Sequence, residues 1–151
     1  MIIARDRDGP IGRVIGNGHC VAHVQAVSDV GHTSLWRRGA RVWPDGVPRG
    51  AIIATFDPDG TYGNHTDGRS HAAVALTVHS GGIDVLDQWV GRPVGPRTIR
   101  NNNGQGPWVN DASRYYVVTY ESASSADRLG SVMARLENVT RRLETAVIRR
   151  T

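Results

Sequence analysis

The 151-residue chain has a single cysteine, at position 20, and no lysine. One thiol cannot form an internal disulfide, so the fold must be stable without covalent cross-links. All 18 basic residues are arginine, a bias typical of GC-rich genomes to which we give no mechanistic meaning. No run of about 18 apolar residues occurs, and the N-terminal segment MIIARDRDGPIGR has charges where a signal peptide needs apolar residues. The sequence predicts neither membrane insertion nor export by a signal peptide.

The composition is typical of a globular protein. Hydrophobic residues make up 39% of the chain and charged residues 21%, which excludes wholesale disorder, and the length suits one compact core. Residues 1–121 hold 12 arginines against 11 acidic residues, whereas residues 122–151 hold 6 against 3. The nearly balanced body predicts no nucleic-acid partner, and only the basic tail favours one.

Hydrophobic spacing predicts one helix and several strands within residues 1–121. After the glycine turn at 16–18, Cys20, Val24 and Val27 share one stripe of a helix expected over about 19–29. Strands are predicted at 51–56, in a hairpin around a three-residue turn at 80–82, at about 97–100 and at 115–121, whereas 32–50 is expected to be loop-rich. These elements predict an α+β domain with an N-terminal helix packed on an antiparallel sheet.

Residues 122–151 have a different pattern. Apolar residues at alternating spacings of three and four are Leu129, Val132, Leu136, Val139, Leu143 and Ala146. This heptad spacing predicts a C-terminal amphipathic helix, which would bury its stripe either on the domain formed by residues 1–121 or on another chain. Self-association through this helix is therefore one expectation.

Cys20 stands at the predicted start of the first helix, where unsatisfied N–H groups favour thiolate over thiol. A lone cysteine on an apolar stripe is also typical of a small buried hydrophobe, so a nearby base is needed to favour chemistry. His71 opens a predicted strand, and the small Ala73 and Ala75 lie on the same strand face. A helix packed on that face would bring the thiol to the imidazole, as nucleophilic catalysis requires.

A carboxylate on the next strand would orient the imidazole of His71. Asp87 falls on the same sheet face and is the candidate for this role. A simple ladder with a three-residue turn sets Asp87 opposite Ala75, so a bulge, a twist or a different turn is required. Gln88 is the alternative orienting residue.

Four segments, GNGHCVAHV, VPRGAIIATF, GRSHAAVALTV and GGIDVLDQW, together resemble CHAP amidases and the wider NlpC-type, papain-like cell-wall peptidases over about residues 12–121. The resemblance implies a papain-like fold and a catalytic set of Cys20, His71 and Asp87 that needs no cofactor. The chain departs from the CHAP pattern in having GHC where GQC is common. It also has Asp87, Gln88 and Trp89 where a glutamate and a nearby asparagine are common.

The implied reaction is hydrolysis of an amide bond in peptidoglycan stem peptides. Backbone N–H groups at the helix start would stabilise the oxyanion, and His19 or Asn17 is the candidate second donor. The sequence also resembles small bacterial amidase toxins delivered by type VI secretion. That resemblance implies synthesis in the cytoplasm without a signal peptide, action in the periplasm of a target cell and a cognate immunity protein.

Several polar and aromatic residues are candidates for substrate binding. Tyr62, Asn64 and His65 belong to the loop that enters the predicted strand, and Trp89 is a candidate wall of the groove. Each is equally typical of an ordinary surface loop or core position.

Metal binding is not predicted. His19 and His23 lie four apart on one helix face, but no acidic residue completes a zinc-enzyme helix motif. Two other functions remain open: a non-catalytic module that binds the wall or a partner, and a cysteine-dependent toxin that modifies acyl or amide groups of a protein.

Overall fold

The computed structural model describes residues 1–120 and 125–148, with side chains described for residues 1–120 and 132–144. The chain divides into two compact units, Met1–Tyr120 and Glu121–Thr151.

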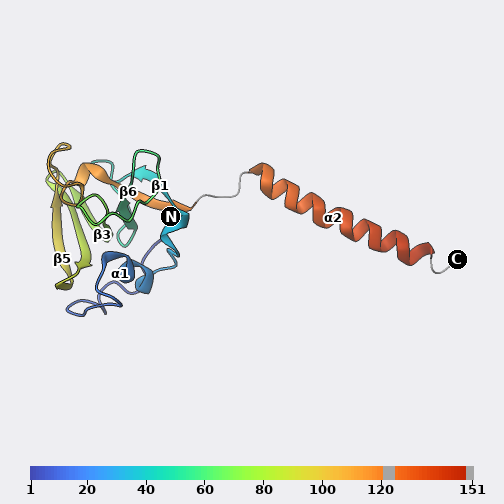
Figure 1. The fold of residues 1–151 in the computed structure, drawn as a ribbon, viewed down its shortest axis with the longest axis horizontal. Coiled ribbons are helices and arrows are strands. Elements are labelled where there is room, and N and C mark those ends of the chain that lie inside the picture. Colours follow the sequence, from blue (N-terminus) through green and yellow to red (C-terminus); the bar gives the residue numbers. More distant parts are fainter. Residues whose placement is uncertain (121–124, 149–151) are drawn as a thin grey trace. The chain divides into compact units, whose positions relative to one another are not determined.

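The first unit is a helix packed on a six-stranded antiparallel sheet (Figure 1). The helix is α1 (Cys20–Val27), and the strands are β1 (Trp36–Arg41), β2 (Ile52–Thr55), β3 (Ala72–His79), β4 (Gly82–Trp89), β5 (Arg92–Arg100) and β6 (Tyr115–Tyr120). The strand order is β1-β6-β2-β3-β4-β5. The last strand in sequence therefore lies inside the sheet, paired with both β1 and β2.

Two hydrophobic clusters cover the two faces of this sheet. Side chains alternate between them along each strand, as a pleated sheet with two buried faces requires. One cluster includes Val24 and Val27 of α1 together with Ile52, Ala54, Ala72, Val74 and Leu86. The other includes Ile53, Ala73, Ala75, Ile83, Val85, Ile99 and Tyr115. The predicted α+β fold, with its N-terminal helix on an antiparallel sheet and a C-terminal helix, is confirmed.

Residues 32–50, expected to be loop-rich, also contain β1, which the sequence did not predict. The sequence of β1, WRRGAR, buries only Trp36 and exposes most of its other residues. Since β1 is an edge strand with β6 as its neighbour in the sheet, it needs no alternating apolar residues, and its charges are tolerated there. The strand expected at 97–100 begins earlier, at Arg92.

The expected three-residue turn of the β3–β4 hairpin is also wrong. His79 pairs with Gly82, which leaves a two-residue turn, and a bulge shifts the register between Ala75 and Thr77. Below the bulge, Ala75 pairs with Val85. Asp87 therefore lies two residues further along β3 toward His71 than the simple ladder predicts. The bulge and the shorter turn supply the register shift that a contact between Asp87 and His71 requires.

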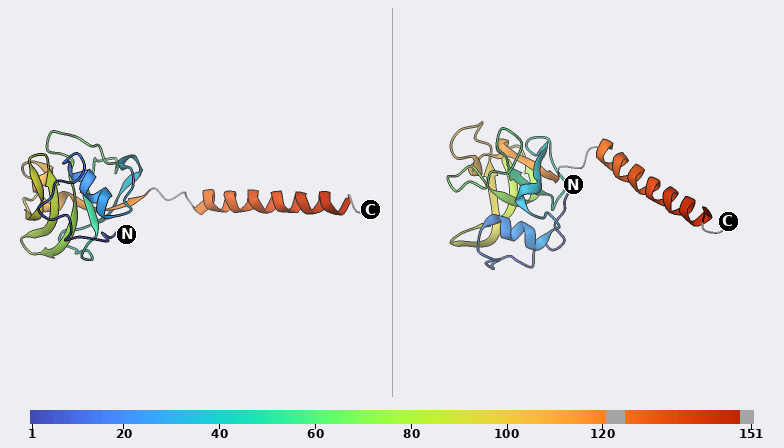
Figure 2. Two further views of the ribbon diagram at one scale, coloured as in Figure 1. Left: turned by 90° about the horizontal axis from the view of Figure 1, so that it is seen from below. Right: turned by 45° about the vertical axis from the view of Figure 1, so that its right-hand side comes forward.

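The helix does not lie on the face predicted for it. α1 contacts β3 and β4, and its Val24 packs in the cluster of Ala72 and Val74, not in that of Ala73 and Ala75. Figure 2 shows α1 beside the sheet in two further views. His71 precedes β3 and is not part of it. The imidazole can therefore reach Cys20 although the helix packs on the other face.

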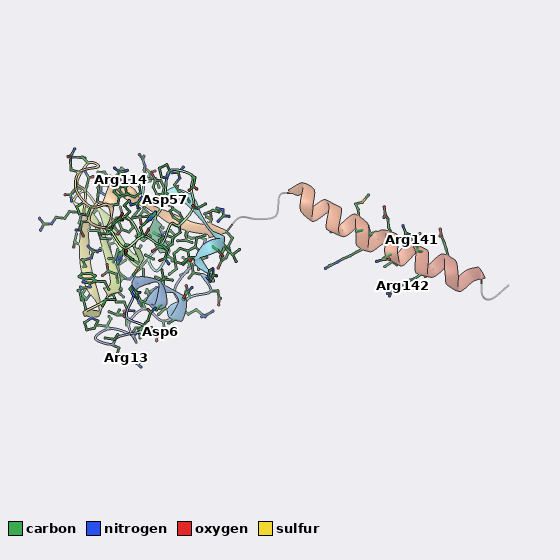
Figure 3. The ribbon with its side chains drawn as sticks, in the orientation of Figure 1. Asp6, Arg13, Asp57, Arg114, Arg141 and Arg142 are labelled. Carbon is green, nitrogen blue, oxygen red and sulfur yellow. The ribbon has the colours of Figure 1, made fainter. Side chains whose placement is uncertain are left out.

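The second unit contains α2 (Ser125–Ile148). The exposed large apolar side chains of its described part are Val132, Met133, Leu136, Val139 and Leu143, each with more than half of its surface in solvent. The side chains of Arg141 and Arg142 project from the same helix (Figure 3). The expected stripe positions at 129 and 146 lie outside the described side chains. Within the described residues, no helix is both long and apolar enough to cross a membrane.

Candidate active site

Cys20 is the first residue of α1 and the free cysteine of the chain. The turn before it uses glycine at two positions with positive φ, 56° at Gly16 and 84° at Gly18, which residues with a Cβ adopt only under strain. His19 occupies the N-cap position and makes no side-chain hydrogen bond to the helix. The sulfur thus sits by the positive end of the helix, where a thiolate is favoured.

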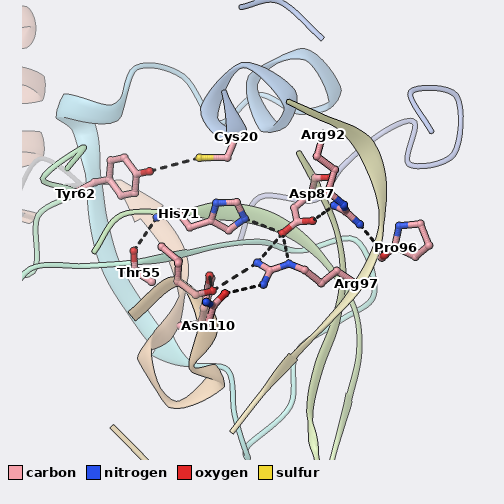
Figure 4. Close-up of polar contacts among 11 residues, drawn as sticks. Cys20, Thr55, Tyr62, His71, Asp87, Arg92, Pro96, Arg97 and Asn110 are labelled. Carbon is pink, nitrogen blue, oxygen red and sulfur yellow. Dashed lines mark hydrogen bonds and ion pairs between the residues drawn. The ribbon is translucent and has the colours of Figure 1, made fainter. Parts of the chain in front are cut away.

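His71 is fixed in front of β3 by hydrogen bonds to Thr55 of β2. Its backbone N–H donates to Thr55 Oγ1 at 3.0 Å, and its C=O accepts from the Thr55 N–H at 3.1 Å. The ring is almost fully buried, and Nε2 lies 2.7 Å from Asp87 Oδ2. In Figure 4 the imidazole lies between Cys20 and Asp87. Because Nε2 is used by Asp87, Nδ1 is left for the thiol.

Asp87 is completely buried, and its carboxylate contacts three cationic side chains, those of His71 and two arginines. Arg92 Nη1 lies 2.9 Å from Oδ1, and Arg97 Nε and Nη2 lie 2.9 and 2.8 Å from Oδ2. Burial alone would raise the pKa of Asp87, but the hydrogen bond and charge of His71, together with Arg97, lower it. The carboxylate is therefore ionised and compensated inside the protein.

The thiol and the imidazole shift each other toward an ion pair. Burial by itself raises the pKa of Cys20, but the hydrogen bond and charge of His71, with smaller contributions from Ala72 N–H and Tyr62, lower it below its usual value of 9.0. Burial by itself lowers the pKa of His71, but its hydrogen bonds to Asp87 and Cys20 raise it to about 9. A thiolate beside an imidazolium is the reactive form of a cysteine nucleophile.

Tyr62 is more closely associated with the nucleophile than its predicted position in a substrate-lining loop implies. It is buried, and its hydroxyl lies 3.9 Å from Cys20 Sγ. Burial raises the pKa of Tyr62 far above its usual value, and the charge of Cys20 adds to this effect. The hydroxyl stays protonated and can donate a hydrogen bond toward the sulfur.

A pocket of about 850 Å³ opens over these residues. Its lining includes Cys20, Tyr62 and His71, together with the other predicted substrate-binding residues Asn64, His65 and Trp89. Asn17 and His19, the candidate oxyanion residues, also line it. Asn17 Oδ1 accepts the His19 backbone N–H at 3.0 Å, so this oxygen stabilises the turn before the nucleophile.

His65 forms a second histidine–carboxylate pair on the pocket wall. Its Nε2 lies 2.9 Å from both oxygens of Asp57, and its Nδ1 lies 3.1 Å from Arg69 Nη2. Since the guanidinium can only donate, Nδ1 accepts the hydrogen bond from Arg69. Nε2 therefore carries the ring N–H and donates it to Asp57. Gly63 makes this packing possible, because a Cβ there would lie 2.2 Å from His65 Nε2.

Gln88 is not brought to His71. Its side chain is completely buried and bonds to backbone groups of Ile15 and His19, on the opposite face of β4 from Asp87. The structure thus assembles Cys20, His71 and Asp87 and leaves Gln88 outside the pocket lining.

Sequence reasoning missed the two arginines on Asp87. Asp87 pairs with Gly95, and Arg97 follows two residues later on the same strand face. A strand predicted from Arg92 onward would have placed both arginines near the carboxylate. Trp89 then packs against them, with the Arg92 and Arg97 guanidinium carbons 4.5 and 5.2 Å from its ring centroid.

The sequence also assigned no specific role to His23. It is completely buried on α1, and neither ring nitrogen has a hydrogen-bond partner among the described residues. Among the side chains described, those of residues 1–120 and 132–144, no three His, Cys, Asp or Glu group closely enough to hold a metal ion.

Comparison with known sequences assigns the chain to a family. The profile of the family described as domesticated amidase effector 2 matches residues 2–118, a range that includes Cys20, His71 and Asp87. The chain belongs to this family.

Relatives of this amidase effector family agree with the assignment. The type VI secretion amidase effector 2 protein of Salmonella typhi is 39% identical over 118 residues, which cover 69% of this chain and 87% of the relative. Domesticated amidase effector 2 of Ixodes scapularis is 35% identical over 88 residues, covering 56% of this chain and 58% of that protein.

A solved structure of type 6 secretion amidase effector 2 (Tae2) matches with a TM-score of 0.65 at 35% identity, over 74% of this chain and 88% of that one. The neighbour has a papain-like fold, which confirms the predicted fold class.

Proposed function

We propose that the chain hydrolyses an amide bond in the stem peptides of peptidoglycan by cysteine nucleophilic catalysis. The observation that carries this proposal is Cys20 at the start of α1, beside a His71 that is bonded to Asp87 at 2.7 Å, at the base of an open pocket. The family supplies the reaction class, because its relatives are named amidase effectors of type VI secretion. Peptidoglycan is the amide-rich polymer that such an effector meets in a target bacterium.

In the proposed mechanism, the Cys20 thiolate attacks the amide carbonyl carbon. Backbone N–H groups at the start of α1 and the Tyr62 hydroxyl stabilise the oxyanion. The His71 imidazolium gives its proton to the leaving nitrogen as the C–N bond breaks, which leaves a thioester on Cys20. Neutral His71 then removes a proton from water, the water attacks the thioester, and the acid leaves with the thiolate restored. Asp87 holds the ring in the orientation that this requires.

The pocket supplies the proposed substrate contacts. Asn64, His65 and Trp89 would contact the peptide on either side of the attacked bond. Because a wall-cleaving enzyme endangers its producer, we also propose a cognate immunity protein that covers this pocket and action in the periplasm of the target cell.

Digestion of purified sacculi, followed by mass spectrometry of the muropeptides, tests the proposal. The wild-type chain should release products that differ from the substrate by one water, and Cys20→Ala and His71→Ala should release none. His79→Ala is the matched control, because His79 also bonds a carboxylate, Asp84 at 3.1 Å, but on the surface. This control should digest sacculi at the wild-type rate.

Other results point to the alternative functions. Binding to sacculi without released products would favour a non-catalytic module. A mass change on a target protein, with intact sacculi, would favour a toxin that modifies proteins.

A further inference from the structure

Gln88 makes three hydrogen bonds that account for its whole amide. Its Oε1 accepts the Ile15 N–H at 3.0 Å, and its Nε2 donates to the C=O groups of Ile15 and His19, both at 2.8 Å. The side chain is completely buried. An amide with both N–H groups in use has none to offer to a substrate oxyanion.

The bonded backbone groups lie on either side of the glycine turn that precedes the nucleophile. Ile15 enters the turn, and His19 is the N-cap residue of α1, directly before Cys20. His19 does not cap the helix with its own side chain, and Gln88 holds the C=O of this N-cap residue from β4. The same turn is closed internally by Gly18 N–H donating to the Ile15 C=O at 3.0 Å.

Strand β4 therefore holds both halves of the candidate site. Successive residues of a strand point to opposite faces. Asp87 uses one face to bind His71, and Gln88 uses the other to bind the turn that carries Cys20. The relative position of sulfur and imidazole is set through two adjacent residues of one rigid strand.

We propose that Gln88 is a positioning residue, which holds the turn before Cys20 so that the sulfur stays beside the His71 imidazole. The inference rests on the proposed function, because it assigns Cys20 as the nucleophile. Glutamate retains the acceptor for Ile15 N–H but loses the two donors, and methionine has similar length and loses all three bonds. Either change removes the two hydrogen bonds that tie the C=O groups of Ile15 and His19 to β4.

The test compares Gln88→Met and Gln88→Glu with wild type in two measurements. The first is the rate of Cys20 alkylation by iodoacetamide as a function of pH in the folded protein, which needs no turnover. The second is kcat and KM on soluble muropeptides. We expect the alkylation profile of both variants to move to higher pH and kcat to fall at least tenfold, with KM changed less than twofold.

Two controls separate positioning from mere stability. Gln105→Met changes an exposed glutamine of a loop and should match wild type. Ile83→Ala weakens the buried core at the other end of β4 and should lower stability without moving the alkylation profile.

The proposal is overturned if the Gln88 variants keep the wild-type alkylation profile and kcat. It is also overturned if they lose activity only in proportion to lost folded protein, as Ile83→Ala would. If Cys20→Ala keeps full hydrolytic activity, the proposed function fails instead, and the alkylation profile still reports whether Gln88 sets the environment of the thiol.

Discussion

The protonation of Cys20 and His71 sets the pH range of the proposed activity. The pKa of Cys20 is below 9.0, and that of His71 is raised to about 9. Below the Cys20 pKa the sulfur is protonated and cannot attack, and above about pH 9 His71 loses the proton that the leaving amine needs. We expect kcat/KM to fall on both sides of this range. Initial rates on muropeptides between pH 5 and 10 measure it.

Removal of the imidazole tests the origin of this range. In His71→Ala the stabilising charge is gone while burial remains, so the Cys20 pKa should rise and alkylation should require higher pH. An unchanged alkylation profile would show that the helix start alone stabilises the thiolate.

Asp87 links catalysis to stability because two arginines depend on it. Asp87→Asn removes the carboxylate that Arg92 and Arg97 share, and we expect a loss of roughly 3 kcal/mol in the free energy of unfolding at neutral pH. Some activity should remain, since an orienting residue is less indispensable than the base. Urea unfolding and kcat measure the two effects.

The control for this substitution is Asp84→Asn on the same strand, where the carboxylate is partly exposed and bonds His79 and Thr98. Its effect on stability should stay within about 1 kcal/mol. Equal stability of the Asp87 and Asp84 variants would contradict a stabilising role for the arginine pair.

His23 should make the fold sensitive to acid. Burial lowers its pKa below 6.5, and the charge of nearby Asp87 only partly opposes this. The unfolded chain binds a proton at about pH 6.5 that the folded protein does not, so stability falls as pH drops below that value. His23→Leu removes this proton uptake. Urea unfolding at pH 5 and 7.5 should show a smaller loss in the variant, and equal losses in both proteins would contradict the assignment.

At the scale of elements, the hairpin turn determines where β4 places Asp87. Gly82 has φ of 151°, and a Cβ there would lie 2.0 Å from the Ile99 carbonyl oxygen. Gly82→Ala should therefore lower the thermal midpoint by several degrees, because either β4 or β5 must shift. Gly81→Ala in the same turn meets only His79 at 3.4 Å and should remain near wild type. Similar midpoints for both variants would contradict this.

The elements with regular apolar patterns were predictable from sequence. The features that depend on pairing with other strands were not. The stripe of Cys20, Val24 and Val27 and the apolar run of β2 gave correct elements, because burial imposes their periodicity. β1 was missed because an edge strand need not alternate. The bulge at Ala75 could not be predicted, since no residue in HAAVALTVH requires it.

The candidate site shows the same division. Cys20, His71 and Asp87 were named from sequence because their residue types and order carry the chemistry. Gln88 stayed open as the alternative partner of the imidazole, since residue type alone does not tell which strand face a register shift selects. Arg92 and Arg97 were missed because their role depends on the pairing of β4 with β5.

For the whole molecule, we propose that residues 1–121 form the hydrolase domain and residues 122–151 an association element. Both hydrophobic clusters are built from residues 4–118, so truncation after Glu121 should leave the domain folded and active. The exposed apolar side chains of α2 would each gain roughly 1.5–3 kcal/mol on burial. We therefore expect the full chain to self-associate in sedimentation and the truncated chain to be monomeric.

Single substitutions on α2 test the same idea without truncation. Leu136→Glu should shift the full chain to monomer, whereas Asn138→Glu, on an exposed position off the stripe, should not. A truncated chain with a lowered melting temperature, beside a monomeric full chain, would show instead that the helix packs on its own domain.

The interior position of β6 ties the activity of this enzyme to the synthesis of the chain through Tyr120. A nascent chain that ends before Tyr115 lacks the strand that joins β1 to β2. Strand β1 then has no neighbouring strand and β2 loses one of its two, and both hydrophobic clusters lack the residues that β6 supplies. Domains fold as units, and pairings distant in sequence form late. Chains that end between Trp89 and Tyr115 should therefore be inert in the cell that makes them, although they already carry Cys20, His71 and Asp87.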